Sequence, residues 1–168
     1  HTLVEFVNVT QPIMWKRFEK RCNSDPYKKF YKCFEDAVQM DGLLFVMRHG
    51  FKHRGLEFKI CYFKPESTLN DGAVKRYEQN VCQCIRQWHY SEQNNNSVDM
   101  MLAINGIPVV AIELKNQLTG QTVDNAKLQW QYDRDQREPA FWLNHRILAY
   151  FAVDLYEAWM ATELKGTD

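Results

Sequence analysis

The chain has no excess of charge of either sign and no long hydrophobic run. Lysine plus arginine and aspartate plus glutamate both number 21, so the formal net charge is zero. Without a global positive field, any affinity for nucleic acid has to come from local basic patches. No apolar run approaches the roughly 20 residues of a bilayer span, and we expect no signal peptide. We therefore expect a cytoplasmic protein without a membrane partner.

The sequence also lacks a zinc-binding cysteine pattern and a phosphate-binding loop. The five cysteines are an odd number and contain no C-x-x-C pair, which favours reduced thiols over a four-ligand zinc site. Cys82 and Cys84 alternate as in a strand and are a weak candidate for a metal-thiolate site. The chain has no Gly-x-x-x-x-Gly-Lys-Ser/Thr loop, so it is not itself an ATP-driven motor.

What is present indicates one folded domain with local basic stretches. The 168 residues are 45% hydrophobic and 14% aromatic, enough for a real core. Lysine and arginine cluster in three stretches of the N-terminal third: 15–21, 27–32 and 48–55. Solvated helix faces are the commoner explanation of such stretches, and nucleic-acid contacts are the alternative.

The first 50 residues carry the signals of helices. Thr10 followed by Pro12 is typical of a helix start, and Ser24 or Asp25 followed by Pro26 repeats the signal. The second helix then presents an apolar stripe with a spacing of four, formed by Phe30, Phe34 and Val38.

The pattern changes after a short apolar helix that ends at Gly50. Alternating segments at 56–63 and 81–90 predict strands, Thr122 caps a helical pattern, and 146–164 predicts two strands around a turn near Asp154. This order favours an α/β fold in which a mixed central sheet is flanked by helices. We expect a single domain over 1–168, with a helical part at 1–50 and the core at 56–168.

An Asn-Gly pair, Asn105-Gly106, joins two apolar runs that end in charge. Asp99 lies near one end of this expected hairpin, and Glu113 and Lys115 lie near the other. Going back from the turn, both acids approach the same end of the hairpin. Two carboxylates at the rim of a buried sheet repel each other and need a cation, a proton or a hydrogen-bond network. A divalent metal is one such partner.

The register of the hairpin decides whether the two acids meet. A two-residue turn pairs Ile104 with Ile107 and puts Asp99 and Glu113 on opposite faces. A three-residue loop, or a bulge elsewhere in the ladder, returns them to one face about 7–8 Å apart. The metal-site interpretation therefore predicts an irregular hairpin. Carboxylates on opposite faces, or buried and neutralised by arginine, would contradict it.

Longer segments of the sequence around these residues resemble a known family. The segments that carry the resemblance are "NGIPVVAIELKNQLTGQTVDNA" after Asp99, "QWQYDRDQREPAF", and "RILAYFAVDLYEAWMATELKG". Together with 47–52, 57–65 and 86–100, they are similar to the N-terminal nuclease domain of the restriction (R) subunit of type I restriction-modification enzymes. The resemblance spans roughly residues 40–168 and implies the PD-(D/E)xK nuclease fold.

The resemblance also implies a site and its partners. It assigns magnesium, or manganese in its place, to Asp99, Glu113 and the main-chain carbonyl of Leu114. It gives Lys115 the task of orienting the attacking water. The family's Gln-x-x-x-Tyr motif corresponds to Gln129 and Tyr132, which here are only three apart. An i,i+3 pair still faces one side of a helix.

The implied enzyme is a type I site-specific deoxyribonuclease of the prokaryotic cytoplasm that cuts double-stranded DNA. Its implied partners are a helicase or translocase domain of the same subunit, which would hold the ATP, and the modification and specificity subunits. The chain begins with His, so we expect a piece of a longer protein. The family's first helix, which carries an acidic residue near the site, is expected to precede it.

Two other interpretations remain open. A non-catalytic module with the nuclease fold would dock partner subunits or DNA, and its carboxylates would be ordinary rim charges. A repair-type nuclease would act on other nucleic acids. A comparison of duplex, single-stranded and RNA substrates separates it from an endonuclease that cuts double-stranded DNA. His89 is more simply a structural histidine than a general base. Lys127, Arg134 and Arg137 either line a DNA channel or are solvated charges.

Overall fold

The computed structural model describes residues 2–22, 25–91, 93–135 and 137–164. It divides the chain into two compact units, which are treated separately below. Unit 1 comprises residues 1–82 with 104–106, and unit 2 comprises 83–103 with 107–168. Where we expected one domain with its core starting at residue 56, the boundary between the two units lies between Cys82 and Gln83.

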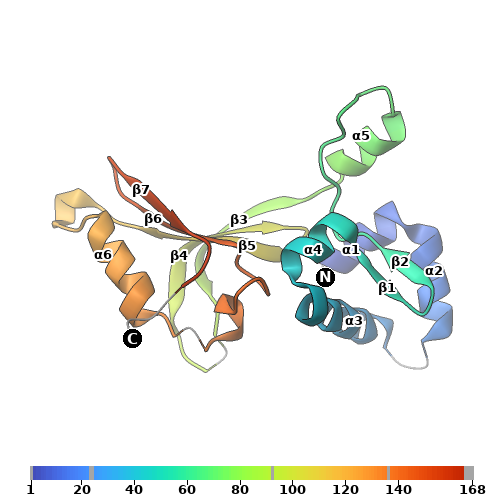
Figure 1. The fold of residues 1–168 in the computed structure, drawn as a ribbon, viewed down its shortest axis with the longest axis horizontal. Coiled ribbons are helices and arrows are strands. Elements are labelled where there is room, and N and C mark those ends of the chain that lie inside the picture. Colours follow the sequence, from blue (N-terminus) through green and yellow to red (C-terminus); the bar gives the residue numbers. More distant parts are fainter. Residues whose placement is uncertain (1, 23–24, 92, 136, 165–168) are drawn as a thin grey trace. The chain divides into compact units, whose positions relative to one another are not determined.

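Unit 1 is mostly helical, as its sequence predicts (Figure 1). Two short strands form a separate antiparallel sheet in which Phe51 pairs with Phe58. The elements are α1 (Thr2–Thr10), α2 (Pro12–Arg21), α3 (Pro26–Asp41), α4 (Leu43–His49), β1 (Phe51–His53), β2 (Leu56–Phe58) and α5 (Asp71–Glu78). The strand predicted over 56–63 is thus only three residues long, and α1 and α5 were not expected.

The caps of these helices follow the sequence signals with one correction. The Asp25 side chain accepts hydrogen bonds from the main-chain N–H groups of Tyr27 and Lys28, and Pro26 is the first residue of α3. The cap predicted at Thr10 is wrong. Gln11 precedes α2, and the Thr10 hydroxyl instead donates to the carbonyl of Phe6 in the last turn of α1.

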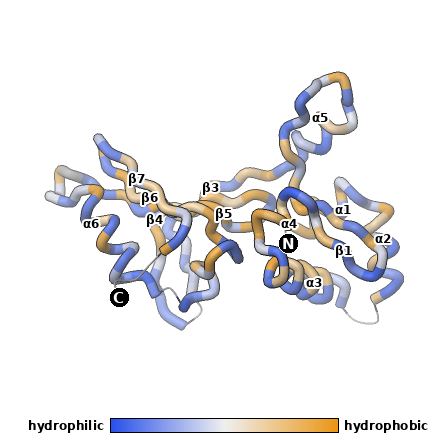
Figure 2. Tube along the Cα trace, viewed as in Figure 1, coloured by the Kyte–Doolittle hydropathy of each residue, from blue (hydrophilic) through white to orange (hydrophobic). Residues whose placement is uncertain are grey.

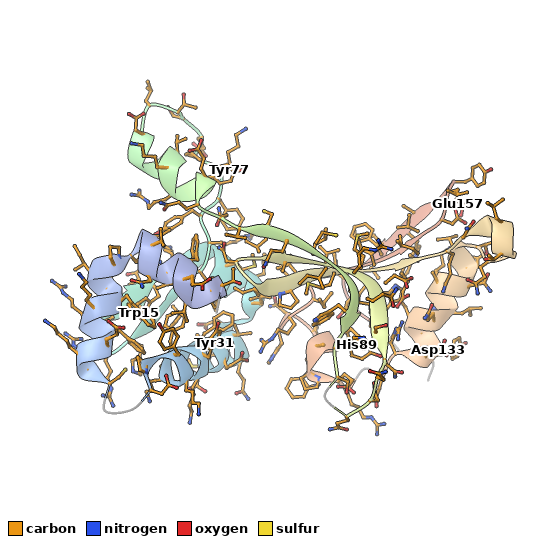
Figure 3. The ribbon with its side chains drawn as sticks, turned by 180° about the vertical axis from the view of Figure 1, so that it is seen from behind. Trp15, Tyr31, Tyr77, His89, Asp133 and Glu157 are labelled. Carbon is orange, nitrogen blue, oxygen red and sulfur yellow. The ribbon has the colours of Figure 1, made fainter. Side chains whose placement is uncertain are left out.

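Aromatic side chains fill the core of unit 1. Trp15 and Phe18 of α2 contact Phe30 of α3, and Phe18 and Phe30 both contact Phe58 of β2. Figure 3 labels Trp15 among the helices of this unit. The stripe expected at Phe30, Phe34 and Val38 is buried as predicted. This core holds the β1–β2 hairpin against α2 and α3.

Unit 2 is built on a five-stranded mixed sheet with the strand order β3-β4-β5-β6-β7. Strands β5 and β6 are parallel, and β6 and β7 are antiparallel. In Figure 2 much of β5 has a hydrophobic colour, as expected for a central strand. The strands are β3 (Cys82–His89), β4 (Ser97–Ile104), β5 (Ile107–Leu114), β6 (Ala149–Val153) and β7 (Ala158–Ala161).

The connection from β5 to β6 carries the helical elements of unit 2. Helix α6 (Val123–Leu128) packs against β5, β6 and β7 and continues as a π-helix, η2 (Gln129–Asp133). Thr122 is the N-cap, as predicted, and Asp154 in the β6–β7 turn also accepts from the N–H of Val123. Short 3₁₀ turns lie at η1 (Gln117–Thr119) and η3 (Pro139–Phe141).

The β4–β5 turn is the two-residue form. Asn105 and Gly106 have φ values of 53° and 80°, typical of the hairpin turn that favours Asn-Gly. The three-residue loop considered above is therefore wrong. Within unit 1, the buried Asn105 amide donates to the carbonyl of Ile60, and its oxygen accepts from the N–H of Val81.

Within the described residues, no helix is long and apolar enough to cross a membrane.

Candidate active site

Asp99 and Glu113 come together on neighbouring strands of unit 2. Asp99 lies in the first half of β4, and Glu113 is the next-to-last residue of β5. Asp99 accepts a hydrogen bond from the N–H of Leu114, the residue next to Glu113, and it is close enough to Glu113 to raise the pKa of that carboxyl group. The arrangement in which the two acids lie on opposite faces is therefore wrong for this chain.

The burial pattern of β4 explains how a two-residue turn allows this contact. Strand β5 alternates without interruption, with buried residues at Ile107, Val109, Ala111 and Glu113. In β4 the alternation breaks, because the consecutive residues Asp99 and Met100 are half-buried between buried Val98 and Met101. An extra residue in one strand of a ladder produces such a break and changes which side chains share a face. The break in alternation lies in β4, because the Asn-Gly turn itself has the two-residue form.

Asp99 is held by two donors. Its Oδ2 accepts from the N–H of Leu114 at 2.8 Å, and its Oδ1 accepts from the Gln87 side chain at 3.1 Å. Gln87 lies in β3 with a φ of 49°, a conformation that non-glycine residues seldom adopt. The Gln87 amide oxygen accepts in turn from the Ser97 hydroxyl. The main chain of Leu114, which the resemblance assigns to the metal, therefore lies beside Asp99.

Glu113 is buried and paired with an arginine. Only 1% of its surface is exposed, and Arg134 donates through both Nε and Nη2 to the same oxygen, Oε1. Arg134 follows η2 directly, is itself buried, and also donates to the Tyr90 hydroxyl. Its guanidinium stacks near the rings of Tyr90 and Trp130. This ion pair is the arrangement that we named above as evidence against a metal site.

The electrostatic balance around Glu113 is nevertheless unfavourable to its charged form. Burial is the main cause that raises the pKa of Glu113 to about 7, and the charge of Asp99 adds to the rise. Arg134 opposes both effects without cancelling them. Glu113 therefore has one guanidinium partner and one neighbouring carboxylate, and the effect of burial outweighs that of the guanidinium.

Lys115 and Gln129 form a second contact beside this pair. The Lys115 ammonium donates to the Gln129 side-chain oxygen at 2.6 Å, and the Lys115 N–H donates to the carbonyl of Val153. Gln129 begins the π-helix that follows α6, and π-helical turns occur frequently at functional sites. Lys115 and Gln129, which the resemblance both assigns to the site, are thus in direct contact.

The structure separates Tyr132 from the other expected site residues. Tyr132 is 61% exposed, and within the described part of the chain it makes no hydrogen bond to them. The π-helical turn changes the angular spacing that the i,i+3 argument assumed, so Gln129 and Tyr132 need not share a face. Instead Arg134, two residues further on, reaches the site. Its role was missed because a sequence does not show that a helix ends in a π turn.

Other residues have simpler roles. Arg137 pairs with Asp135 and Lys127 with Asp124 at the surface, so these two are solvated charges. Trp130 is fully buried and donates to the carbonyl of Phe151, as expected of a core residue. His89, labelled in Figure 3, is an exposed residue at the end of β3.

The donor set is suited to a hard divalent cation bound with water and phosphate. Among the described residues, no group of three or more His, Cys, Asp or Glu side chains could hold a metal. Mg²⁺ is commonly bound by only one or two carboxylates, with water and substrate phosphates completing its shell. Asp99 and Glu113 meet that requirement, provided that the cation replaces Arg134 at Glu113.

Comparison with known proteins gives one family. A search of curated proteins and a search of solved structures found no significant match. A family model described as the N terminus of the type I restriction enzyme R protein matches residues 10–168, which include every residue of this site. The chain therefore belongs to the family of type I restriction enzyme R protein N termini.

Proposed function

We propose that the chain is a magnesium-dependent endonuclease domain that hydrolyses phosphodiester bonds of double-stranded DNA as part of a type I restriction enzyme. The observation that carries the proposal is the meeting of Asp99 and Glu113 on one face of the sheet, beside the Lys115–Gln129 pair. Two acids and a lysine at this spacing are the chemistry that metal-assisted phosphodiester hydrolysis needs.

Asp99, Glu113 and the carbonyl of Leu114 would hold the ion, and Mn²⁺ would be an alternative to Mg²⁺. When bound, the ion polarises the phosphate and lowers the pKa of a bound water. The Lys115 ammonium, held by Gln129, stabilises the negative charge that develops on the phosphate and orients the attacking water. Glu113 has to lose its proton or its bond to Arg134 before it binds the ion.

The expected partners follow from the family. Within a type I restriction enzyme, the chain would act with modification and specificity subunits, and a translocase domain of the same R protein would supply DNA with the use of ATP. With zero net charge, this chain would bind free duplex weakly and without sequence preference.

The Arg134–Glu113 pair favours a second candidate, a nuclease-like module that does not cut. In that case Arg134 permanently neutralises Glu113, and the site serves only to hold β4, β5 and η2 together. The fold and the family would be the same for both candidates, so activity has to separate them.

Nicking of supercoiled plasmid provides the test. The 168-residue chain is incubated with plasmid and Mg²⁺ or Mn²⁺, and Asp99→Asn, Glu113→Gln and Lys115→Met are compared with wild type. The endonuclease proposal expects metal-dependent nicking that each variant lowers at least about a hundredfold. If wild type and all three variants nick equally, or if none nicks even within the complete enzyme, the non-cutting module is the better account. Single-stranded DNA and RNA as additional substrates test the repair-type alternative.

A further inference from the structure

Each of the three basic stretches of the sequence contributes one positively charged side chain to the lining of a single cavity in unit 1. Arg21 comes from 15–21, Lys29 from 27–32 and Arg54 from 48–55. The cavity measures about 170 Å³, well above the volume that one water needs. Phe18, Leu56 and His53 also line it, and no carboxylate is among its described lining residues.

The backbone of Arg54 is in a conformation that favours another residue. Arg54 and Gly55 form the two-residue turn between β1 and β2, with φ values of 48° and 77°. Asn is strongly preferred at the first position of such a turn, and the chain has Asn105 at the equivalent place in its other hairpin. An arginine kept at this disfavoured position points to a use for its side chain.

The charges in this cavity are not compensated by acids. Within the described ranges, none of Arg21, Lys29 and Arg54 forms an ion pair. Arg21 is positioned by a hydrogen bond from its Nη1 to the carbonyl of Arg54 at 2.9 Å. Burial is the main cause that lowers the pKa of His53, and the positive charges of Lys29 and Arg54 add to this effect while Asp36 opposes it.

We propose that the cavity formed by Arg21, Lys29 and Arg54 binds a phosphate group of a DNA backbone. Two guanidinium groups and an ammonium are the donors that recognise phosphate, and guanidinium binds it through two parallel hydrogen bonds. A chain with zero net charge needs such a local site to hold DNA. Phosphate contacts fix position without reading sequence. The site goes beyond the cleavage proposed above, and the choice of DNA as its ligand rests on that proposed function.

The experiment uses the 168-residue chain carrying Glu113→Gln, without divalent metal, so that binding is measured apart from cleavage. Inorganic phosphate is titrated by calorimetry, and a short duplex is titrated by fluorescence anisotropy at several salt concentrations. The test variants are Arg54→Asn and Arg21→Gln. The control is the double variant Lys16→Gln/Arg17→Gln. It removes two exposed charges of α2, the helix that carries Arg21, and neither residue lines the cavity.

Arg54→Asn separates binding from folding. Because Asn suits the turn better than Arg, this variant is expected to keep or raise the melting temperature. The proposal expects it to weaken phosphate binding about tenfold and to lower the salt dependence of duplex binding by about one unit of slope. Arg21→Gln should act in the same way, and the control should leave phosphate binding unchanged.

Three results would overturn the proposal. The first is the absence of saturable phosphate binding by the wild-type cavity, together with an unchanged salt slope in both test variants. The second is an equal loss of duplex affinity in the control and test variants, which would mean that only general charge matters. The third is weakened phosphate binding with unchanged duplex binding, which would identify free phosphate and not DNA as the ligand.

Discussion

Arg134 donates two hydrogen bonds to one carboxylate oxygen of Glu113, at the place where a metal ion would need that oxygen. The charge of the neighbouring Asp99 contributes to the raised pKa of the same carboxyl group. Glu113 therefore has two possible cationic partners, and the guanidinium is the one that the structure shows. If a divalent ion is the other, the two cations compete, and the competition can be measured.

Removal of the guanidinium is expected to increase the effect of metal on stability. Arg134→Gln leaves Glu113 buried without its cation, which destabilises the folded state by roughly 3–5 kcal/mol. Mg²⁺ that binds there would restore the lost charge, so it should raise the melting temperature of Arg134→Gln more than that of wild type. The melting temperatures of both proteins are measured without Mg²⁺ and at Mg²⁺ concentrations that increase in tenfold steps. Equal responses of the two proteins would indicate that the ion does not replace Arg134.

Metal affinity should depend on pH through Glu113. The pKa of this group is raised to about 7, so at lower pH a proton occupies the carboxylate that the metal needs. We expect the apparent affinity for Mn²⁺ to fall by up to tenfold per pH unit below about 7 and to level off above it. Glu113→Asp, which retains a carboxylate, should keep a pH dependence, and Glu113→Gln should lose it. A pH-independent affinity in wild type would exclude Glu113 as a ligand.

Gln129 should affect cleavage through Lys115. Gln129→Leu removes the 2.6 Å partner of the Lys115 ammonium, so the rate of plasmid nicking should fall by about tenfold to a hundredfold while metal binding is retained. Gln131→Leu is the matched control, because Gln131 is exposed in the same π-helix. The same loss in both variants would assign the effect to the helix and not to the contact with Lys115.

Asn105 should be important for stability although it is not one of the expected site residues. Asn105→Ala removes the hydrogen bonds to Ile60 and Val81 and places alanine at a φ of 53°, which together cost roughly 2–4 kcal/mol. Chemical denaturation measures the change. Asn105→Gly, which restores the backbone freedom but not the hydrogen bonds, should recover only part of the loss. Full recovery would show that the side-chain bonds contribute nothing.

The sequence predicted what depends on local pattern and pairing. The caps at Asp25 and Thr122, the apolar stripe of α3 and the β6–β7 hairpin are confirmed because each is set by a few neighbouring residues. The proximity of Asp99 to Glu113 was one of two arrangements that the sequence left open, because it depends on the register of the hairpin. The two-residue turn is now established, and the alternation of β4 breaks at Asp99 and Met100, which nothing in "SVDMM" indicates.

The remaining errors concern contacts that no local signal reports. Arg134 was considered either a DNA contact or a solvated charge, whereas it is buried against Glu113, Tyr90 and Trp130. Tyr132 was placed at the site by its spacing, which the π-helical turn makes invalid. Likewise, the joining of Arg21, Lys29 and Arg54 in one cavity follows from tertiary packing and could not be predicted from three separate basic stretches.

Calorimetric titration of the chain with Mn²⁺ tests the central claim most directly, with wild type compared against Glu113→Gln and Asp99→Asn at pH 8, above the pKa of Glu113. The account predicts saturable heat for wild type and its loss in both variants, each still folded by circular dichroism. Equal heats in all three proteins, or no heat in wild type under conditions that support nicking, would contradict a metal site at Asp99 and Glu113.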